Sequence, residues 1–577
     1  MPACQPCRVA ILAGLMPVIT GLPVLLSAQS ADLTAARAAE QRRISVIQQA
    51  VPATVCIFSA NGQSGGSGVL VSPEGFALTN FHVVEPCGKH MHCGLPDGSI
   101  YDAVLVGIDP VGDVALIRLL GRDDFPVARM GDSDQVRIGD FCFAVGNPFL
   151  LAGNFQPSVS WGIVSGVHRY QYPSGTLLEY ADSIQTDAAI NPGNSGGALF
   201  DGQGELIGIN GRGSFEKRGR VNVGVGFAIS INQIRMFYDH LLSGRIVDHA
   251  TLGATVTSDR RGLIRVSDIR QGSDAWRRGL RYGDEVVSLG GHAVTSVNDF
   301  KNILGTFPAG WRVPLEFRRD EKVVRIRVRL EGVHTPQQLA ERVQQRPPRE
   351  RPVPDQGPPD ESGPAIPRAS VPEPVTRWIE DRPGFANYYF NRLQTDRIWT
   401  AYHQVAGTLQ QQERVRMSGS LDDGTPVQLV LSVARSGIQL GDQARVIEQP
   451  VDLSLPDELA GSGGLLTALH LWYRLLHRGP DRTGDTGYAG KLPGPDEELA
   501  DVLACNTDGV QVRFLFGPDS GLLDGIEFFS AADRDPCEIG LADYRRAGQV
   551  SLPHLITVTC GDQYRREIRI DKINLDP

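Results

Sequence analysis

The sequence has few cysteines, no block of basic residues and, beyond its first 30 residues, no long hydrophobic run. Nine cysteines in 577 residues are too few for disulfides to be the scaffold. Lys and Arg total 56 against 66 Asp and Glu, a formal charge of −10, so no general basic face is available to nucleic-acid phosphates. These shortages exclude a disulfide-rich miniprotein, a polytopic membrane protein and a general nucleic-acid binder.

The first 30 residues are typical of a signal peptide. An apolar run covers residues 9–26, and Ala28 and Ser30 provide the small-x-small pattern of a cleavage site. We expect cleavage before Ala31 and a periplasmic or secreted protein. The alternative is an uncleaved segment that anchors the chain in the membrane, but the run is interrupted by Pro17, Gly21 and Pro23.

An odd number of cysteines, seven, remains after residue 30. Cys87 and Cys93 enclose the short segment CGKHMHC, which also carries His90 and His92. We interpret this segment as a loop, in which a disulfide, a metal site or free thiols are the alternatives. Because four donors within seven residues rarely wrap one tetrahedral ion, we predict no metal and leave the disulfide state open.

The composition changes sharply after Leu330, where eleven prolines lie between Pro336 and Pro374 and predict an extended linker. Before it, short strand-like runs separated by glycines predict a mainly β sandwich or barrel. The predicted strands are 54–58, 67–71, 76–80, 104–108, 114–119, 141–145, 206–209 and 225–229. Helices are predicted over 31–49, 232–242 and 297–304.

Three segments carry the residue types of nucleophilic catalysis. His82 follows an apolar strand, Asp113 precedes another, and Ser195 lies in the glycine-rich turn NPGNSGG. A serine hydroxyl needs a base to become a nucleophile, and histidine can take and return a proton near neutral pH. A buried carboxylate fixes the tautomer of the imidazole. The order His, Asp, Ser is that of the chymotrypsin architecture.

The glycines next to Ser195 allow the backbone to curl so that the N–H groups of Gly193 and Ser195 converge. Such donors stabilise the oxyanion of a tetrahedral intermediate, each by about 10²–10³ in rate. We therefore predict an oxyanion hole at Gly193, Asn194 and Ser195.

Five motifs between about residues 40 and 332 resemble the HtrA/Deg family of trypsin-like serine proteases: TNFHVVE, DPVGDVALIRL, GNPF, IQTDAAINPGNSGGAL and GVGFAIS. The resemblance implies a chymotrypsin-like double β-barrel, a PDZ domain and trimer-based homo-oligomers. It implies that His82 is the general base and acid, Asp113 the orienting carboxylate and Ser195 the nucleophile. Asp102 and Asp109 compete for the carboxylate role, but Asp113 directly precedes the buried strand.

The same resemblance places Ala189 and Ile190 at the primary substrate pocket. Because no carboxylate stands there, we expect small or medium aliphatic substrate side chains, which unfolded proteins expose. In the PDZ-like unit, Leu252, Gly253 and Ala254 match the loop that captures peptide C-termini. A larger aliphatic residue is common where Ala254 stands, and a purely structural PDZ unit is the alternative.

Two segments are interpreted less specifically. Residues 168–180, with Tyr170, Tyr172 and Tyr180, occupy the place of a regulatory loop of the family. Residues 376–577 predict a curved sheet with a helix, weakly similar to the half-barrel of lipoprotein carriers. The helix carries an apolar stripe near residues 465–476. A β-bulge is expected between Ile570 and Ile573, where the alternation changes parity.

The sequence thus predicts a signal peptide (1–30), a protease domain (31–245), a PDZ domain (250–332), a proline-rich linker (333–375) and a C-terminal α+β domain (376–577). The predicted function is a periplasmic or secreted serine endopeptidase that degrades unfolded or damaged proteins through an acyl-enzyme and needs no cofactor. The alternative is a proteolytically silent holdase or PDZ scaffold. Expected partners are unfolded substrates, peptide C-termini and further copies of the chain, but no nucleic acid.

Overall fold

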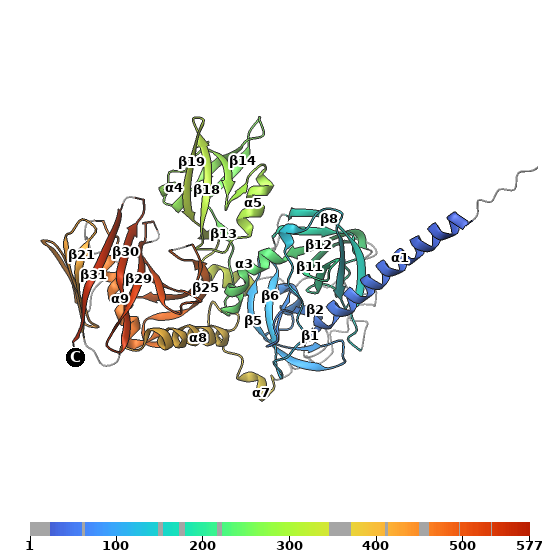
Figure 1. Ribbon diagram of the computed structural model, residues 1–577, viewed down its shortest axis with the longest axis horizontal. Coiled ribbons are helices and arrows are strands. Elements are labelled where there is room, and N and C mark those ends of the chain that lie inside the picture. Colours follow the sequence, from blue (N-terminus) through green and yellow to red (C-terminus); the bar gives the residue numbers. More distant parts are fainter. Residues whose placement is uncertain are drawn as a thin grey trace, which may run out of the picture. The chain divides into compact units, whose positions relative to one another are not determined.

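The computed structural model describes residues 23–59, 64–147, 154–171, 179–215, 222–344, 371–409, 414–448, 461–495, 497–531, 533–562 and 564–576 (Figure 1). The chain divides into two units, residues 1–49 and 50–577. Helix α1 (Pro23–Ala50) contains the predicted helix over 31–49. No helix among the described residues is long and apolar enough to cross a membrane. Most of the predicted signal peptide, residues 1–22, lies outside the described part.

The predicted double barrel is confirmed: two closed antiparallel sheets follow one another, in the strand orders β1-β2-β3-β6-β5-β4 and β10-β11-β12-β9-β8-β7. The first barrel consists of β1 (Thr54–Ser59), β2 (Gly65–Leu70), β3 (Phe76–Thr79), β4 (His90–Gly94), β5 (Ile100–Asp109) and β6 (Val114–Leu119). The second consists of β7 (Phe141–Gly146), β8 (Ser158–Gln171), β9 (Tyr180–Thr186), β10 (Ala198–Asp201), β11 (Leu206–Phe215) and β12 (Asn222–Ser230). Helical elements in this region are η1 (Val51–Ala53), α2 (Phe81–Val84), η2 (Ser133–Gln135) and α3 (Ile231–Leu242).

Each strand predicted in this region overlaps an observed one, whereas β4, β8, β9 and β10 are absent from the prediction. The interpretation of CGKHMHC as a loop is wrong for its second half, because His90–Gly94 is β4, paired with β1 and β5. Along this strand Met91 and Cys93 are completely buried in the barrel. His90 and His92 alternate with them and therefore share the other face. The sequence pattern did not predict this strand because its buried apolar face consists of only two side chains, Met91 and Cys93.

The predicted PDZ unit is a sheet of order β14-β15-β16-β18-β19, with β14 at its edge and α5 in contact with β14. Its strands are β13 (Ala250–Thr251), β14 (Ala254–Ser258), β15 (Ile264–Ile269), β16 (Glu285–Leu289), β17 (His292–Ala293), β18 (Arg312–Arg319), β19 (Lys322–Arg329) and β20 (Glu331–Gly332). Its helices are α4 (Asp274–Arg277) and α5 (Val297–Gly305). Ser296 caps α5 by accepting a hydrogen bond from the N–H of Asp299.

The predicted extended linker is interrupted at its start by α6 (Pro336–Gln344), so the prediction of extended structure is wrong for these residues. Leu339 on this helix is 2% exposed, and this buried contact favours the helix. Residues 345–370 of the linker lie outside the described residues. Helices α7 (Glu373–Thr376) and α8 (Tyr388–Ala406) follow.

The C-terminal region is an antiparallel sheet of eleven strands in the order β24-β23-β22-β21-β31-β30-β29-β28-β27-β26-β25. The strands are β21 (Arg414–Leu421), β22 (Pro426–Leu431), β23 (Arg435–Leu440), β24 (Gln443–Glu448), β25 (Asp485–Pro493), β26 (Leu499–Thr507), β27 (Val510–Phe516), β28 (Leu523–Phe529), β29 (Cys537–Ala547), β30 (Val550–Cys560) and β31 (Tyr564–Asp576). Helix α9 (Leu465–Arg478) lies between β24 and β25 in the chain, with η4 (Pro480–Arg482) after it.

Helix α9 contacts β22–β24 from one part of this sheet and β27–β29 from another. A helix can touch strands so far apart in the order only if the sheet curves around it. Eleven of the 14 residues of α9 are buried, so the helix fills the concave side. The predicted bulge is confirmed: Ser418 of β21 pairs with Lys572 and Gly419 with Ile570, which leaves Asp571 as the extra residue.

A buried ion cluster joins the PDZ unit to this sheet. Arg329 at the end of β19 binds Glu527 of β28 at 2.6 Å and Glu538 of β29 at 2.8 Å. Arg513 also binds Glu527. Burial opposes ionisation, but the two flanking arginines outweigh it and hold the pKa of Glu527 below its usual value. Each buried charge thus has an opposite partner, so removal of one of these partners destabilises the contact.

Candidate functional site

The first element of the candidate active site is a buried carboxylate bonded to a histidine. The Nδ1 atom of His82 lies 2.8 Å from Oδ2 and 3.0 Å from Oδ1 of Asp113, and the backbone N–H of His82 donates to Oδ1 at 3.1 Å. The Tyr180 hydroxyl donates to Oδ2 at 2.6 Å. Asp113 is completely buried, whereas 17% of the His82 side chain is exposed.

These contacts determine the charge of Asp113 and the tautomer of His82. Burial opposes ionisation of Asp113, but the His82 imidazole and the hydrogen bonds from His82 and Tyr180 outweigh it, so the pKa of Asp113 lies below its usual value. An ionised carboxylate only accepts hydrogen bonds. His82 therefore carries its hydrogen on Nδ1 when neutral, which leaves Nε2 available to accept a proton.

Strand pairing explains why residues 31 positions apart meet here. Thr79, the last residue of β3, pairs with Ala115 of β6. The residues just after β3 therefore lie opposite the residues just before β6. The N–H of Phe81 and the side-chain amide of Asn80 both donate to the Asp113 carbonyl, at 3.1 and 2.9 Å. Asp113 adopts a positive φ of 59°, a conformation that Asp tolerates better than most residues.

Ser195 lies in the turn before β10, and contacts with the first barrel hold this turn beside His82. The carbonyl of Ser195 accepts from the N–H of Ser67 on β2 at 2.9 Å. The Ser67 hydroxyl donates to the Gly193 carbonyl at 2.7 Å. A Cβ placed on Gly66 would lie 2.9 Å from the Ser195 carbonyl oxygen and 2.8 Å from the Val83 side chain. The turn that carries Ser195 and the side chain of Val83, the residue after His82, thus both lie against Gly66.

The Ser195 hydroxyl donates to the carbonyl of Gly211 at 3.1 Å. No hydrogen bond links Ser195 to His82, both of which are described residues. Catalytic hydrogen bonds are often loose before substrate binds.

The predicted oxyanion hole is a sharp turn. Gly193 has a φ of 100°, which only glycine adopts without strain. Asn194 is buried, and its N–H donates to the carbonyl of Asn191 at 2.9 Å. Within the described residues, the N–H groups of Gly193 and Ser195 have no acceptor. Both donors of the predicted hole are therefore free for a ligand.

The residues predicted for the substrate pocket lie just before this turn. Ile190 is completely buried, and its side chain is 2.7 Å from where a Cβ on Gly226 would stand. The carbonyl of Ala189 accepts from the Asn194 side chain at 3.3 Å. Ile190 belongs to the apolar core of the second barrel, together with Ile184 and Leu199, and the predicted substrate pocket stays a prediction.

The two competing acids bind other histidines. Asp109 binds His249 at 2.8 Å in a buried pair, and it also accepts from the N–H groups of Val111 and Gly112. Asp102 binds His90 at 2.8 Å. Neither carboxylate contacts His82 in this structure. The cysteines of the described region are free thiols, and burial raises the pKa of the Cys93 thiol well above its usual value.

In the PDZ unit, the predicted peptide loop precedes an edge strand. Gly253 has a φ of 69° and accepts a hydrogen bond from the N–H of Arg270. Leu252 is buried, and Ala254 begins β14, which pairs with β15 on one side only. A free strand edge next to a helix is the geometry on which extended peptides add as a further strand.

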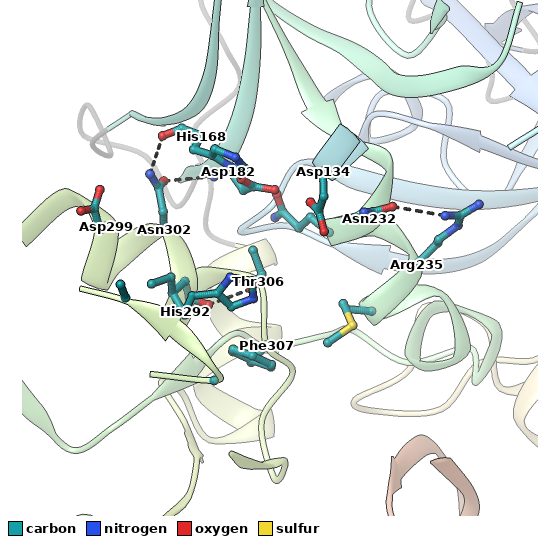
Figure 2. Close-up of a pocket in the computed structure, with 15 residues that line it drawn as sticks. Asp134, His168, Asp182, Asn232, Arg235, His292, Asp299, Asn302, Thr306 and Phe307 are labelled. Atoms are coloured by element: carbon teal, nitrogen blue, oxygen red, sulfur yellow. Dashed lines mark hydrogen bonds and ion pairs between the residues drawn. The ribbon is translucent and has the colours of Figure 1, made fainter. Parts of the chain in front are cut away.

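Sequence reasoning named Tyr180 only as one aromatic residue of segment 168–180 and missed its hydrogen bond to Asp113. The neighbours of Tyr180 on β9 contact the PDZ helix α5: the N–H of Asp182 donates to the Asn302 side chain at 3.0 Å. The Asn302 amide in turn donates to the His168 carbonyl at 2.6 Å, as Figure 2 shows. Helix α5 therefore bonds to β9 two residues from Tyr180.

A cavity of about 640 Å³ lies beside this contact (Figure 2). Asp134, His168, His292, Asp299 and Phe307 are among its lining residues. His82, Asp113 and Ser195 do not line it, so it is separate from the candidate catalytic groups.

Comparisons with known proteins show what the two regions of the chain are similar to. Residues 66–209 match the family model of the trypsin-like peptidase domain, and residues 250–330 match the PDZ domain. A probable periplasmic serine endoprotease DegP-like from Chlamydia trachomatis is 36% identical over 301 residues, covering 48% of this chain and 57% of that protein. Periplasmic serine endoprotease DegP of Escherichia coli is 37% identical over 280 residues, covering 46% and 56%.

The chain thus spans little more than half the length of these curated relatives. Among solved structures, an HtrA-type protease AlgW with a tripeptide is 31% identical. The match covers 51% of this chain and 98% of that chain, with a TM-score of 0.43.

Proposed function

We propose that this chain, which matches the trypsin-like peptidase and PDZ domains and is similar to DegP proteases, is a periplasmic or secreted serine endopeptidase of the HtrA/Deg family in which His82, Asp113 and Ser195 cleave unfolded proteins. The observation that carries the proposal is the buried Asp113 carboxylate beside the Ser195 turn. It accepts hydrogen bonds from the backbone N–H and the imidazole of His82 and from the Tyr180 hydroxyl.

In the first half-reaction the Ser195 hydroxyl rotates from Gly211 toward His82 and attacks the substrate carbonyl carbon. The Nε2 atom of His82 takes the hydroxyl proton, and the negative charge of Asp113 stabilises the imidazolium that forms. The substrate oxygen becomes an oxyanion and accepts hydrogen bonds from the N–H groups of Gly193 and Ser195. Collapse of this intermediate breaks the peptide bond, and His82 returns the proton to the leaving amine.

The second half-reaction repeats these roles with water. His82 removes a proton from water as the water oxygen attacks the acyl-enzyme carbonyl. The second tetrahedral intermediate uses the same two N–H donors. Its collapse releases the carboxylate product and returns the proton to Ser195.

The substrate class follows from the predicted pocket. Ala189 and Ile190 offer no charge that would hold a basic or acidic side chain, so small and medium aliphatic residues are favoured. Folded proteins bury such residues, and unfolded or damaged proteins expose them. Selection for accessible aliphatic residues therefore directs cleavage to unfolded chains.

The PDZ unit is proposed to bind the free C-terminus of a peptide, with β14 as the receiving edge and the loop at Leu252–Ala254 as the carboxylate site. The bond between Asn302 and Asp182 offers a route from this groove to Tyr180 and hence to Asp113. Trimer-based oligomers are proposed from the family alone.

The decisive experiment compares the wild-type chain with Ser195→Ala on native α-lactalbumin and on the same protein with its disulfides reduced. We expect the wild type to degrade the reduced form much faster, and Ser195→Ala to degrade neither. Ser418→Ala removes an exposed hydroxyl on β21 and should match the wild type. Equal degradation by wild type and Ser195→Ala would refute the mechanism, and a wild type that degrades nothing favours the silent scaffold.

A second arm adds a peptide with a free aliphatic C-terminus, or the same peptide with an amidated C-terminus. The free peptide should raise turnover and the amide should not. Unchanged rates at a saturating concentration of the free peptide would count against coupling between the PDZ unit and the protease.

A further inference from the structure

Three side chains of the kinds that bind metal ions lie close together on the first barrel, and none of them is a catalytic candidate. His90 and His92 are two residues apart on β4, so their side chains point to the same face. On the neighbouring strand β5, Asp102 is the register partner of His92. Antiparallel pairing thus completes a set of two imidazoles and one carboxylate, a combination that binds divalent zinc in proteins.

The donor atoms are already close enough to share one ion. Oδ1 of Asp102 lies 2.8 Å from Nε2 of His90 and 3.3 Å from Nδ1 of His92, and the three ligand atoms all lie within 4.8 Å of one another. Two donors on a tetrahedral zinc ion are about 3.3 Å apart, given metal–ligand distances near 2.1 Å. Side-chain shifts of roughly 1 Å or less would therefore form the site.

The cysteines of the same segment do not belong to this cluster. Cys93 alternates with His92 along β4, so its side chain points to the opposite face, into the barrel, where it is completely buried. The structure thereby separates the four donors of CGKHMHC, of which only the two histidines gather with Asp102. The third ligand comes from another strand, which the spacing within the segment could not reveal.

The cluster is rigid on one side and open on the other. The His90 side chain is only 6% exposed, whereas that of His92 is 30% and that of Asp102 38% exposed. The ring of Phe58 on β1 contacts His92, with centroids 5.7 Å apart. The burial of His90 and the contact of His92 with Phe58 limit the movement of these two ligands, and the exposed side of Asp102 leaves room for water as a fourth ligand.

We propose that His90, His92 and Asp102 form a binding site for a divalent zinc ion, with water in the fourth position. Two neutral imidazoles and one carboxylate leave a site charge of +1, which an open water-filled side tolerates. The ion would tie β4 to β5. Because only residues 85–89 separate β4 from α2, which carries His82, the bound ion would also stabilise the chain next to the catalytic histidine.

The test measures zinc binding by calorimetry, with a competing chelator, on the full chain carrying Ser195→Ala to prevent self-digestion. We expect one zinc ion per chain and a higher unfolding temperature in its presence. In this background, His92→Ala and Asp102→Asn should weaken binding by at least about 100-fold, more than the roughly 10- to 100-fold cost of losing a residue that only supports a ligand. His292→Ala, which removes an exposed histidine of the PDZ unit, should bind zinc as before.

Two outcomes would overturn the proposal through the location of the metal. If His82→Ala abolishes zinc binding while His92→Ala keeps it, the ion occupies the catalytic histidine instead. Cobalt replaces zinc as a spectroscopic probe: visible ligand-field bands without a near-ultraviolet thiolate band support the assigned ligands, and a thiolate band refutes them. Absence of stoichiometric zinc binding in the folded chain would mean that the three side chains form only a structural hydrogen-bond cluster. These results do not depend on proteolytic activity.

Discussion

Removal of one hydroxyl group, by Tyr180→Phe, tests the electrostatics of the candidate active site. The hydroxyl donates to the buried Asp113 carboxylate at 2.6 Å, and a hydrogen bond to a charged group contributes about 1.5–3 kcal/mol to stability. At about 2–4 °C per kcal/mol for a domain of this size, the midpoint of thermal unfolding should fall by about 3–12 °C at pH 7. Scanning calorimetry of the full chain, in a Ser195→Ala background, measures this shift.

The way this shift of the unfolding midpoint changes with pH follows from the pKa of Asp113. The pKa of Asp113 is lowered in the folded chain, so its contribution to stability is present above about pH 4, the usual pKa of Asp. That contribution is lost as the pH falls through the lowered folded value. Loss of the Tyr180 hydroxyl raises the pKa of Asp113 in the folded chain toward its usual value. The difference in unfolding midpoint between the wild type and Tyr180→Phe should therefore shrink below about pH 4.

Tyr402→Phe is the matched control for this experiment. The Tyr402 hydroxyl is buried and has no hydrogen-bond partner among the described residues, so its removal should leave the unfolding midpoint unchanged or raise it. If Tyr180→Phe and Tyr402→Phe shift the unfolding midpoint alike, or if the shift caused by Tyr180→Phe does not shrink as the pH is lowered from 7 until Asp113 is protonated, then the hydroxyl does not stabilise the carboxylate and the reasoning fails.

Two further substitutions test the serine turn and the buried ion cluster. In Gly196→Ala, a Cβ at a φ of 82° would overlap the Ser67 carbonyl and the Thr79 hydroxyl, so peptidase activity should fall below detection; Gly202→Ala, whose Cβ would have no neighbour closer than 3.7 Å, should keep it. Arg329→Met removes the cation shared by Glu527 and Glu538, which keep only Arg513 and Arg312 as partners, and should destabilise the chain in urea by about 1.5–3 kcal/mol, the contribution of hydrogen bonds to charged groups. Arg325→Met removes an exposed pair with Glu316 and should cost less than about 1 kcal/mol; equal losses for the two arginines would refute the role of the buried cluster.

Local patterns in the sequence predicted a mainly β fold and pointed to the catalytic candidates, whereas the double barrel was implied by the resemblance to the HtrA/Deg family. Glycine-separated apolar runs predicted eight of the strands, because each run buries its own alternating face wherever the other strands lie. The turn NPGNSGG predicted a sharp backbone at Gly193, because only glycine adopts that φ without strain. The parity change between Ile570 and Ile573 predicted the bulge, since the side chains of a strand must alternate. Polar strands such as β4 escaped prediction because their apolar faces were too short to show a period.

Contacts between strands distant in the sequence could be decided only by the tertiary structure. Which of Asp102, Asp109 and Asp113 faces His82 depends on the register of β3 with β6, and a shift of one residue would turn the carboxylate away. Tyr180 reaches Asp113 from the second barrel, and Asp102 reaches His90 and His92 from the neighbouring strand; no spacing within one segment encodes either meeting. The sequence by itself determined which chemical groups the chain carries and which way each strand turns them. Only the packing of the sheets decided which groups meet, because hydrogen-bond and ligand geometry is satisfied within a few tenths of an ångström and local patterns place atoms far less closely.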